Sequence, residues 1–160
     1  MSTAMESSDY ILLKSQFEAL VSDEPDVLAN ASNFVGLLFN ALDDINWLGI
    51  YVLRDGELVL GPFQGKPACI RIPIGHGVCG TAAATLETQR VSNVHEFPGH
   101  IPCDDASLSE IVVPLVIDGS LVGVLDIDSP TIDRFNAIDQ EGVELLCSAF
   151  CASQSGRNFI

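Results

Sequence analysis

The segment GHIPCDDASLSEI, residues 99 to 111, places a cysteine in a polar stretch that is typical of a loop. Cys103 is followed directly by Asp104 and Asp105. Intracellular cysteines are usually small buried apolar residues, and two neighbouring carboxylates favour the protonated, unreactive form of a thiol. A cysteine in this position therefore needs an explanation in the chemistry of the residues that the fold brings near it.

Two carboxylates lie on one face of the strand-like segment LVGVLDIDSP, residues 121 to 130. With the strand period of two, Val122, Val124, Asp126 and Asp128 share a face. The carboxylates repel each other, and burial would raise the pKa of at least one of them. One interpretation is that both touch water at the strand end, where Asp128 caps a turn. The other is a protonated acid that faces a ligand pocket.

Glu110, at the start of the preceding strand SEIVVPLVI, is the third candidate acid. If the intervening DG is a strict two-residue turn, Glu110 falls opposite Ile127 and points to the other face. A three-residue turn or a single bulge would bring it opposite Asp128. Pro114 cannot donate to the ladder, which makes an irregularity near it reasonable. The pattern therefore allows a cluster of three acids but does not require one.

Aromatic residues on another predicted strand suggest a binding wall. Trp47, the only tryptophan, shares a strand face with Gly49 and Tyr51. Ordinary core packing is one interpretation. The alternative is an aromatic wall that receives a small apolar or cationic group.

Metal binding is the alternative role for the loop cysteines. Zinc ligands would come from two H-x-x-C segments, whose residues are His76, Cys79, His100 and Cys103. This spacing is unusual for structural zinc, where C-x-x-C pairs dominate, so we expect no metal. Cys147 and Cys151, four residues apart in a predicted helix, indicate packing.

The amino-acid composition limits the classes of molecule that the protein is expected to bind. The 160 residues include 48% apolar residues, and 22 acidic against 7 basic side chains give a formal charge of -15. Such a surface repels nucleic acid and anionic membranes. It also disfavours anionic substrates unless Lys66, Arg71 or Arg90 forms a local exception. We find no secretory signal and no apolar run of the ~20 residues that a membrane span needs. A cytoplasmic protein is expected, and five cysteines there do not predict a permanent disulfide framework.

The elements that position these residues predict one α+β domain over residues 1–160. Helical spacing indicates N-terminal helices within 10–43, with Pro25 in the first turn of the second. Strands and a glycine-rich loop that opens a short helix fill a sheet-and-pocket region, 46–130, and two DG pairs predict tight hairpins. A terminal helix over 136–153 has Asn136 as its N-cap. Strands outnumber crossover helices, so we expect helices against one face of a mostly antiparallel sheet.

Four segments together resemble a known family: GPFQGKPACIRIPIGHGVCGTAA, VSNVHEFPGHIPCD, SEIVVPL and GVLDIDSP. They are similar to the free methionine-(R)-sulfoxide reductases, which are built on a GAF domain, and the resemblance runs from about Asn46 to Phe135. It implies a six-stranded antiparallel sheet, with N- and C-terminal helices on one face and a ligand pocket under loops on the other. It also implies reduction of free methionine sulfoxide.

The resemblance implies a role for each candidate residue. Cys103 matches the catalytic thiol, Cys69 the principal resolving thiol and Cys79 a second resolving thiol. The carboxylates and the aromatic wall of the substrate pocket match Glu110, Asp126, Asp128, Trp47 and Tyr51. Glu110 and Asp128 are also the catalytic acids by this resemblance.

These roles fit the chemistry of a sulfoxide, which is a poor electrophile until its oxygen is protonated or strongly hydrogen-bonded. A buried neutral carboxylic acid is a suitable donor, and proton transfer toward the sulfoxide would help Cys103 to deprotonate. The resulting sulfenic acid would condense with a resolving thiol, and a dithiol reductant such as thioredoxin would reopen the disulfide. No bound cofactor is expected. We expect a homodimer that forms through the terminal helices. The alternative is a non-catalytic GAF sensor of a small ligand or of redox state.

Overall fold

The computed structural model describes residues 3–101 and 106–160, and it is built on a six-stranded antiparallel sheet. The strands follow the order β3-β2-β1-β6-β5-β4, so the chain's last strand lies beside its first. Their bounds are β1 Trp47–Arg54, β2 Glu57–Gly65, β3 Arg71–Pro73, β4 Gln89–Val91, β5 Ser109–Ile117 and β6 Ser120–Ser129. The expected antiparallel sheet is confirmed.

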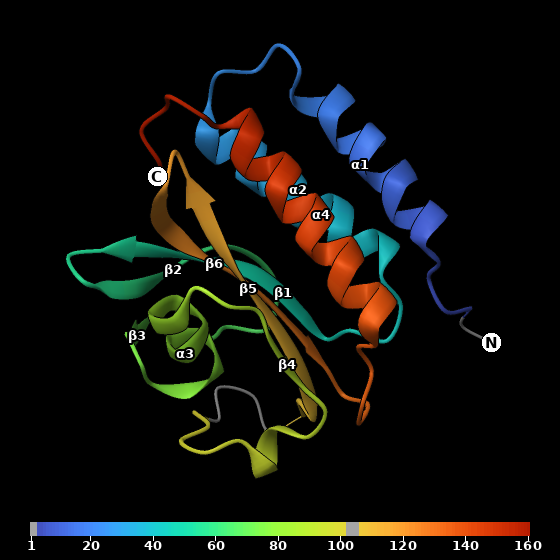
Figure 1. Cartoon of the computed structure of the whole chain (residues 1–160), viewed down its shortest axis with the longest axis vertical. Helices are drawn as coiled ribbons and strands as arrows, with labels where there is room; N and C mark the ends of the chain where they lie inside the picture. The colour runs from blue at the N-terminus through green and yellow to red at the C-terminus, as the bar shows by residue number, and fades with distance from the viewer. Residues whose placement is uncertain (1–2, 102–105) are drawn as a thin grey trace.

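Helices cover the two faces of this sheet unequally. α2 (Val27–Ala41) and α4 (Ala137–Ser153) pack on one face, and α1 (Ser7–Val21) packs on these two helices. The short α3 (Gly77–Thr85) and its flanking loops lie on the other face (Figure 1). A single 3-10 turn, η1 (Val94–Glu96), interrupts the loop between β4 and β5. The α+β layering and the pocket-side position of the loops agree with the expectation.

Helix starts are set by capping residues. The side chain of Asp26 accepts a hydrogen bond from the backbone N–H of Ala29, so Asp26 is the N-cap of α2. Pro25 therefore precedes the cap, and its expected place in the first turn is wrong. α1 begins at Ser7, three residues before the expected residue 10. Asn136 caps α4 as expected.

Both DG pairs form tight hairpins. Asp55 and Asp118 have φ values of 50° and 51°, and the glycines that follow have 82° and 81°. Two consecutive residues with positive φ are the requirement of the type I′ turn, which asparagine or aspartate followed by glycine satisfies at little cost. Each hairpin is thus closed by two residues, as the sequence predicts.

A bulge in the second hairpin decides which side chains face the pocket. Val116 pairs with Leu121 but Leu115 pairs with Gly123, so β6 carries an extra residue between them. The shift brings Glu110 opposite Asp128, as one of the two predicted alternatives requires. It also turns Val122 toward the helix-side core, so the expectation that Val122 shares the face of the two aspartates is wrong.

Two apolar clusters lie on opposite faces of the sheet. The helix-side core joins the terminal helices through Phe17, Phe34 and Phe150, with ring centroids 5.0 Å apart for the first pair and 4.8 Å for the last two. The pocket-side cluster includes Trp47, Tyr51 and the small residues of α3. In the part of the chain that the structure describes, no helix is long and apolar enough to cross a membrane.

Candidate active site

A pocket opens on the sheet face that α3 covers. Six predicted site residues line it: Trp47, Tyr51, Cys79, Glu110, Asp126 and Asp128. Strands β1, β5 and β6 supply the aromatic and acidic side chains, and α3 supplies the thiol. The two loops that bound the pocket are those before β3 and before β5. The structure thus gathers residues that lie up to 81 positions apart in the sequence, from 47 to 128.

Glu110 and Asp126 form the buried centre of the pocket. They keep only 7% and 6% of their surface exposed, and both come from neighbouring antiparallel strands. Burial raises the pKa of Glu110 well above its usual range, and the charges of Asp126 and Asp128 raise it further. Burial also raises the pKa of Asp126, although hydrogen bonds with Glu110 and Cys79 partly oppose that shift. Both shifts favour the protonated forms of these two acids.

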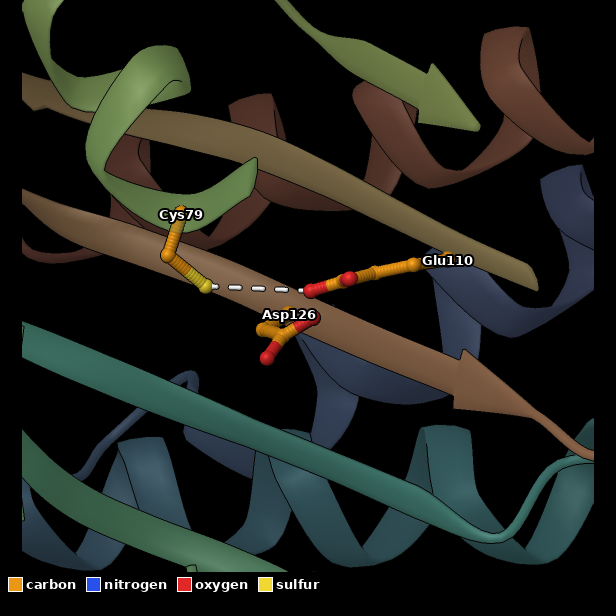
Figure 2. Close-up of side chains that lie close together, drawn as sticks. All are labelled: Cys79, Glu110 and Asp126. Carbon is orange, nitrogen blue, oxygen red and sulfur yellow. Dashed lines mark hydrogen bonds between the residues drawn. The ribbon is translucent and has the colours of Figure 1, made fainter. Parts of the chain in front are cut away.

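Cys79 points from α3 toward these acids (Figure 2). Its thiol donates to Oε1 of Glu110 over 3.9 Å. Burial raises the pKa of the Cys79 thiol well above its usual value, and the charges of Asp126 and Glu110 add to the shift. Cys79 is a free, neutral thiol that contacts the acids directly, a contact that the sequence pattern does not indicate.

The aromatic wall is a stack of three rings. The Trp47 ring lies 5.8 Å from that of Tyr51 and 5.4 Å from that of Phe63, measured between centroids. Trp47 Nε1 donates to the carbonyl of Lys66, and the Tyr51 hydroxyl donates to the carbonyl of Cys69. These bonds tie the wall to the loop before β3, so the aromatic side chains serve both the core and the pocket.

Of the thiols assigned to nucleophilic and resolving roles, Cys79 lies on α3 and Cys69 lies in the loop before β3. Cys69 is partly buried and disulfide-bonded. Cys103, with Asp104 and Asp105, falls outside the described residues. Ile101 and Ser107, both described, line the pocket.

Several pocket residues escaped the sequence reasoning. Lys66, His76 and Ser107 line the pocket. The sequence suggested Lys66 only as a basic exception on a negative surface and His76 only as a possible zinc ligand. Phe63, which does not line the pocket but stacks on Trp47, was not singled out at all. Arg71 and Arg90 are the other basic side chains that could offset the negative surface. Arg71 forms an ion pair with Glu57 at 2.6 Å, and Arg90 lies exposed on β4.

The alternative zinc set is not brought together among the described residues, and its fourth member, Cys103, lies outside them. The potential ligand atoms that do lie close together belong to Cys79, Glu110 and Asp126, all within 4.8 Å of one another. His76 and His100 line the same pocket, but neither belongs to that group. Among the described residues, the thiol and the two acids are therefore the candidate metal ligands of this pocket.

The fold and the pocket place the chain among GAF-domain proteins, and a GAF domain family model matches residues 29–150. The Escherichia coli free methionine-R-sulfoxide reductase is 53% identical over 137 residues, which are 86% of this chain and 83% of that protein. Bacillus subtilis YtsP is 56% identical over 135 residues, or 83% of each chain. The solved structure of fRMsr of Staphylococcus aureus in complex with substrate superposes with a TM-score of 0.90 at 47% identity, covering 97% of this chain and 100% of that one. The chain belongs to the free methionine-R-sulfoxide reductase family of GAF-domain proteins.

Proposed function

We propose that this chain reduces free L-methionine-(R)-sulfoxide to L-methionine, with Cys103 as the nucleophile. One observation supports this most: three carboxylates and an aromatic wall converge on one pocket. A free amino acid has an α-ammonium group that carboxylates bind, and a methyl sulfoxide end that needs a proton donor and an apolar contact. The pocket offers both kinds of group within one small volume.

Glu110 is the preferred proton donor. Burial and two neighbouring carboxylates raise the pKa of its carboxyl group and so favour the neutral form. A hydrogen bond from this acid to the sulfoxide oxygen polarises the S–O bond, so a thiolate can attack the sulfur. Asp128 pairs with Glu110 across the strands and can return the proton that the donor gives up. Trp47 would hold the S-methyl group, which favours one sulfoxide epimer by shape.

The first half-reaction moves oxygen from the substrate to the enzyme. The Cys103 thiolate attacks the substrate sulfur and forms a bond to it while the sulfoxide oxygen takes up a proton. The resulting hydroxyl group then transfers to the Cys103 sulfur as the S–O and S–S bonds to the methionine sulfur both break. The products are methionine and a cysteine sulfenic acid. A second thiol then displaces water from the sulfenic acid and forms a disulfide. Cys69 is the preferred partner, because burial and nearby acids hold the Cys79 thiol neutral and therefore weakly nucleophilic. Cys79 remains a second resolving thiol in this proposal.

A dithiol reductant completes the cycle. Thioredoxin, in the cytoplasm, is the proposed donor, since two-electron exchange through a mixed disulfide returns both thiols. A homodimer through the terminal helices is also proposed, because α1 exposes Ile11, Leu12 and Leu20. Light scattering at several concentrations tests the dimer, and turnover with thioredoxin, its reductase and NADPH tests the reductant.

Methionine release from the pure sulfoxide epimers, with dithiothreitol as reductant, tests the reaction. We expect turnover of the (R) epimer by the wild type, none by Cys103→Ser, and at most a trace with the (S) epimer. Cys147→Ser is the matched control, because that buried cysteine lies on the helix-side core and should leave turnover unchanged. Absence of turnover with either epimer would overturn the proposal, and turnover by Cys103→Ser would overturn its nucleophile.

A further inference from the structure

Cys79, Glu110 and Asp126 have the arrangement of a three-ligand cation site. Their sulfur and oxygen atoms all lie within 4.8 Å of one another, and the Sγ of Cys79 is 3.9 Å from Oε1 of Glu110 (Figure 2). Ligand bonds of about 2.3 Å to sulfur and 2.0 Å to oxygen in a tetrahedral zinc site imply a separation of roughly 3.5 Å between the two atoms. A change of a few tenths of an ångström in the Glu110 side chain would close that gap.

An unpartnered oxygen provides the independent sign of a ligand. Oδ1 of Asp126 is fully buried, lines the pocket, and has no hydrogen-bond partner among the described residues. A buried carboxylate oxygen without a partner is costly, and a cation or a ligand donor at that position would remove the cost. The three side chains come from α3, β5 and β6, so rigid elements hold them in place.

We propose that the reduced pocket binds a thiophilic divalent cation, Zn²⁺ in the first instance, through Cys79, Glu110 and Asp126. The thiol proton and the proton shared by the acids leave as the ion enters, so the ion replaces protons that otherwise balance the buried negative charge. One thiolate and two carboxylates favour Zn²⁺ and Co²⁺ over Mg²⁺ and Ca²⁺, which bind oxygen ligands alone. Three protein ligands leave the fourth coordination position open to the pocket.

The bound ion excludes the sulfoxide. It occupies the acids that would protonate the sulfoxide and bind the ammonium, so metal and substrate compete for the same groups. This consequence rests on the proposed function, whereas the binding of the ion does not.

Cobalt titration of the reduced protein tests the site without any activity measurement. The protein is reduced with a phosphine, which leaves no competing thiol in solution, and titrated anaerobically with Co²⁺. We expect one ion per chain, a near-ultraviolet thiolate-to-cobalt band and visible bands of tetrahedral cobalt, all removed by Zn²⁺. Cys79→Ser should abolish the thiolate band and weaken binding at least about tenfold, and Asp126→Asn should weaken it comparably.

Two control variants locate the ion. Cys147→Ser should bind Co²⁺ as the wild type does. Loss of the thiolate band in Cys69→Ser with its retention in Cys79→Ser would place the metal on other thiols and overturn the proposal, as would the absence of any thiolate band.

Single-turnover methionine release by the prereduced enzyme, at buffered free Zn²⁺, tests the competition. We expect zinc to raise the sulfoxide concentration needed for half-maximal rate and to leave the maximal rate unchanged. An effect of zinc on the maximal rate alone would overturn competition at this site. If no sulfoxide is turned over at all, the proposed function fails while the cobalt experiment still decides whether the cation site exists.

Discussion

Trp47 and Phe63 lie on neighbouring strands with their rings stacked, 5.4 Å apart between centroids and inclined by 16°. Phe63 does not line the pocket, so it acts on the pocket through Trp47. Because Trp47 is the only tryptophan, its fluorescence reports directly on this contact.

Phe63→Leu should therefore loosen the indole. Aromatic stacking contributes about 0.5–1.5 kcal/mol, so we expect a several-fold higher KM for the (R) sulfoxide, weaker epimer selectivity and a shifted tryptophan emission. Phe159→Leu is the matched control, since Phe159 contacts Phe150 edge-to-face at the helix-side core. A control variant that changes KM as much as Phe63→Leu does would show that the effect is general destabilisation.

Gly49 gives the ring stack its room. A Cβ at this position would lie 2.4 Å from Trp47 and 2.5 Å from Phe63, too close for either ring to stay in place. Gly49→Ala should lower the free energy of unfolding by about 1–3 kcal/mol and displace the tryptophan. Gly36, on α2, would meet nothing within 4 Å, so Gly36→Ala should raise stability by about 0.5–1 kcal/mol. Urea denaturation followed by circular dichroism checks both signs, and equal effects would contradict the packing argument.

Substitutions of the two tyrosines should affect stability and activity differently. The Tyr10 hydroxyl donates to Asp139 over 2.7 Å and joins α1 to α4, far from the pocket. Tyr10→Phe should cost about 1.5–3 kcal/mol of stability, because the lost bond is to a charged group, and should leave KM unchanged. Tyr51→Phe loses only a neutral bond to the carbonyl of Cys69 and should act mainly on turnover. Denaturation and steady-state kinetics on both variants test this contrast, which an increased KM in Tyr10→Phe would contradict.

Local sequence signals predicted the elements well because each has a short-range cause. The DG pairs dictate the hairpins, and Asn136 dictates the start of α4. The start of α1 was less predictable, since it depends on Glu6 and Asp9, a capping pair without the usual serine or threonine.

The composition of the pocket was harder to predict because it depends on two strand irregularities. Each hairpin is closed by a two-residue turn. With that turn alone, Phe63 in the first hairpin and Glu110 in the second would point to the opposite face of the sheet. In β1–β2 the register shifts between Gly49 and Tyr51, near Pro62, and brings Phe63 opposite Gly49. In β5–β6 the shift lies beside Pro114 and brings Glu110 opposite Asp128. A proline in a strand signals an irregularity, but it does not state which strand gains the extra residue.

The contact between Cys79 and the acids had no signal in the sequence. Cys79 lies on a helix that crosses over the sheet, and its distance from Glu110 depends on how α3 is placed, not on any periodicity. The family resemblance named the residue but assigned it a thiol-exchange role alone. Only the three-dimensional structure shows the thiol as a hydrogen-bond donor within the acid cluster.

The raised pKa of Glu110 makes stability depend on pH. The unfolded carboxyl has a pKa of 4.5 and the folded one a higher value, so the native state binds more protons above pH 4.5. This contribution to stability is complete below pH 4.5 and is lost as pH rises toward the folded pKa. Glu110→Gln keeps the shape and cannot ionise, so it should gain stability relative to the wild type between pH 5 and pH 8. The gain is about 1.4 kcal/mol for each unit of pKa shift that the window covers.

Urea denaturation of both proteins across this pH range, with a chelator present, measures the difference. The difference between the two proteins also cancels the opposite contribution of His100. Burial lowers the pKa of His100, so its contribution to stability grows as pH rises toward 6.5 and is complete above that pH. Because Asp126 shares protons with Glu110, its own pKa should fall in the Gln variant, which adds to the gain at high pH. Glu87→Gln, an exposed glutamate, is the control and should run parallel to the wild type. If Glu110→Gln also runs parallel, the acid is already ionised in the native state at pH 5, and it cannot serve as the neutral proton donor.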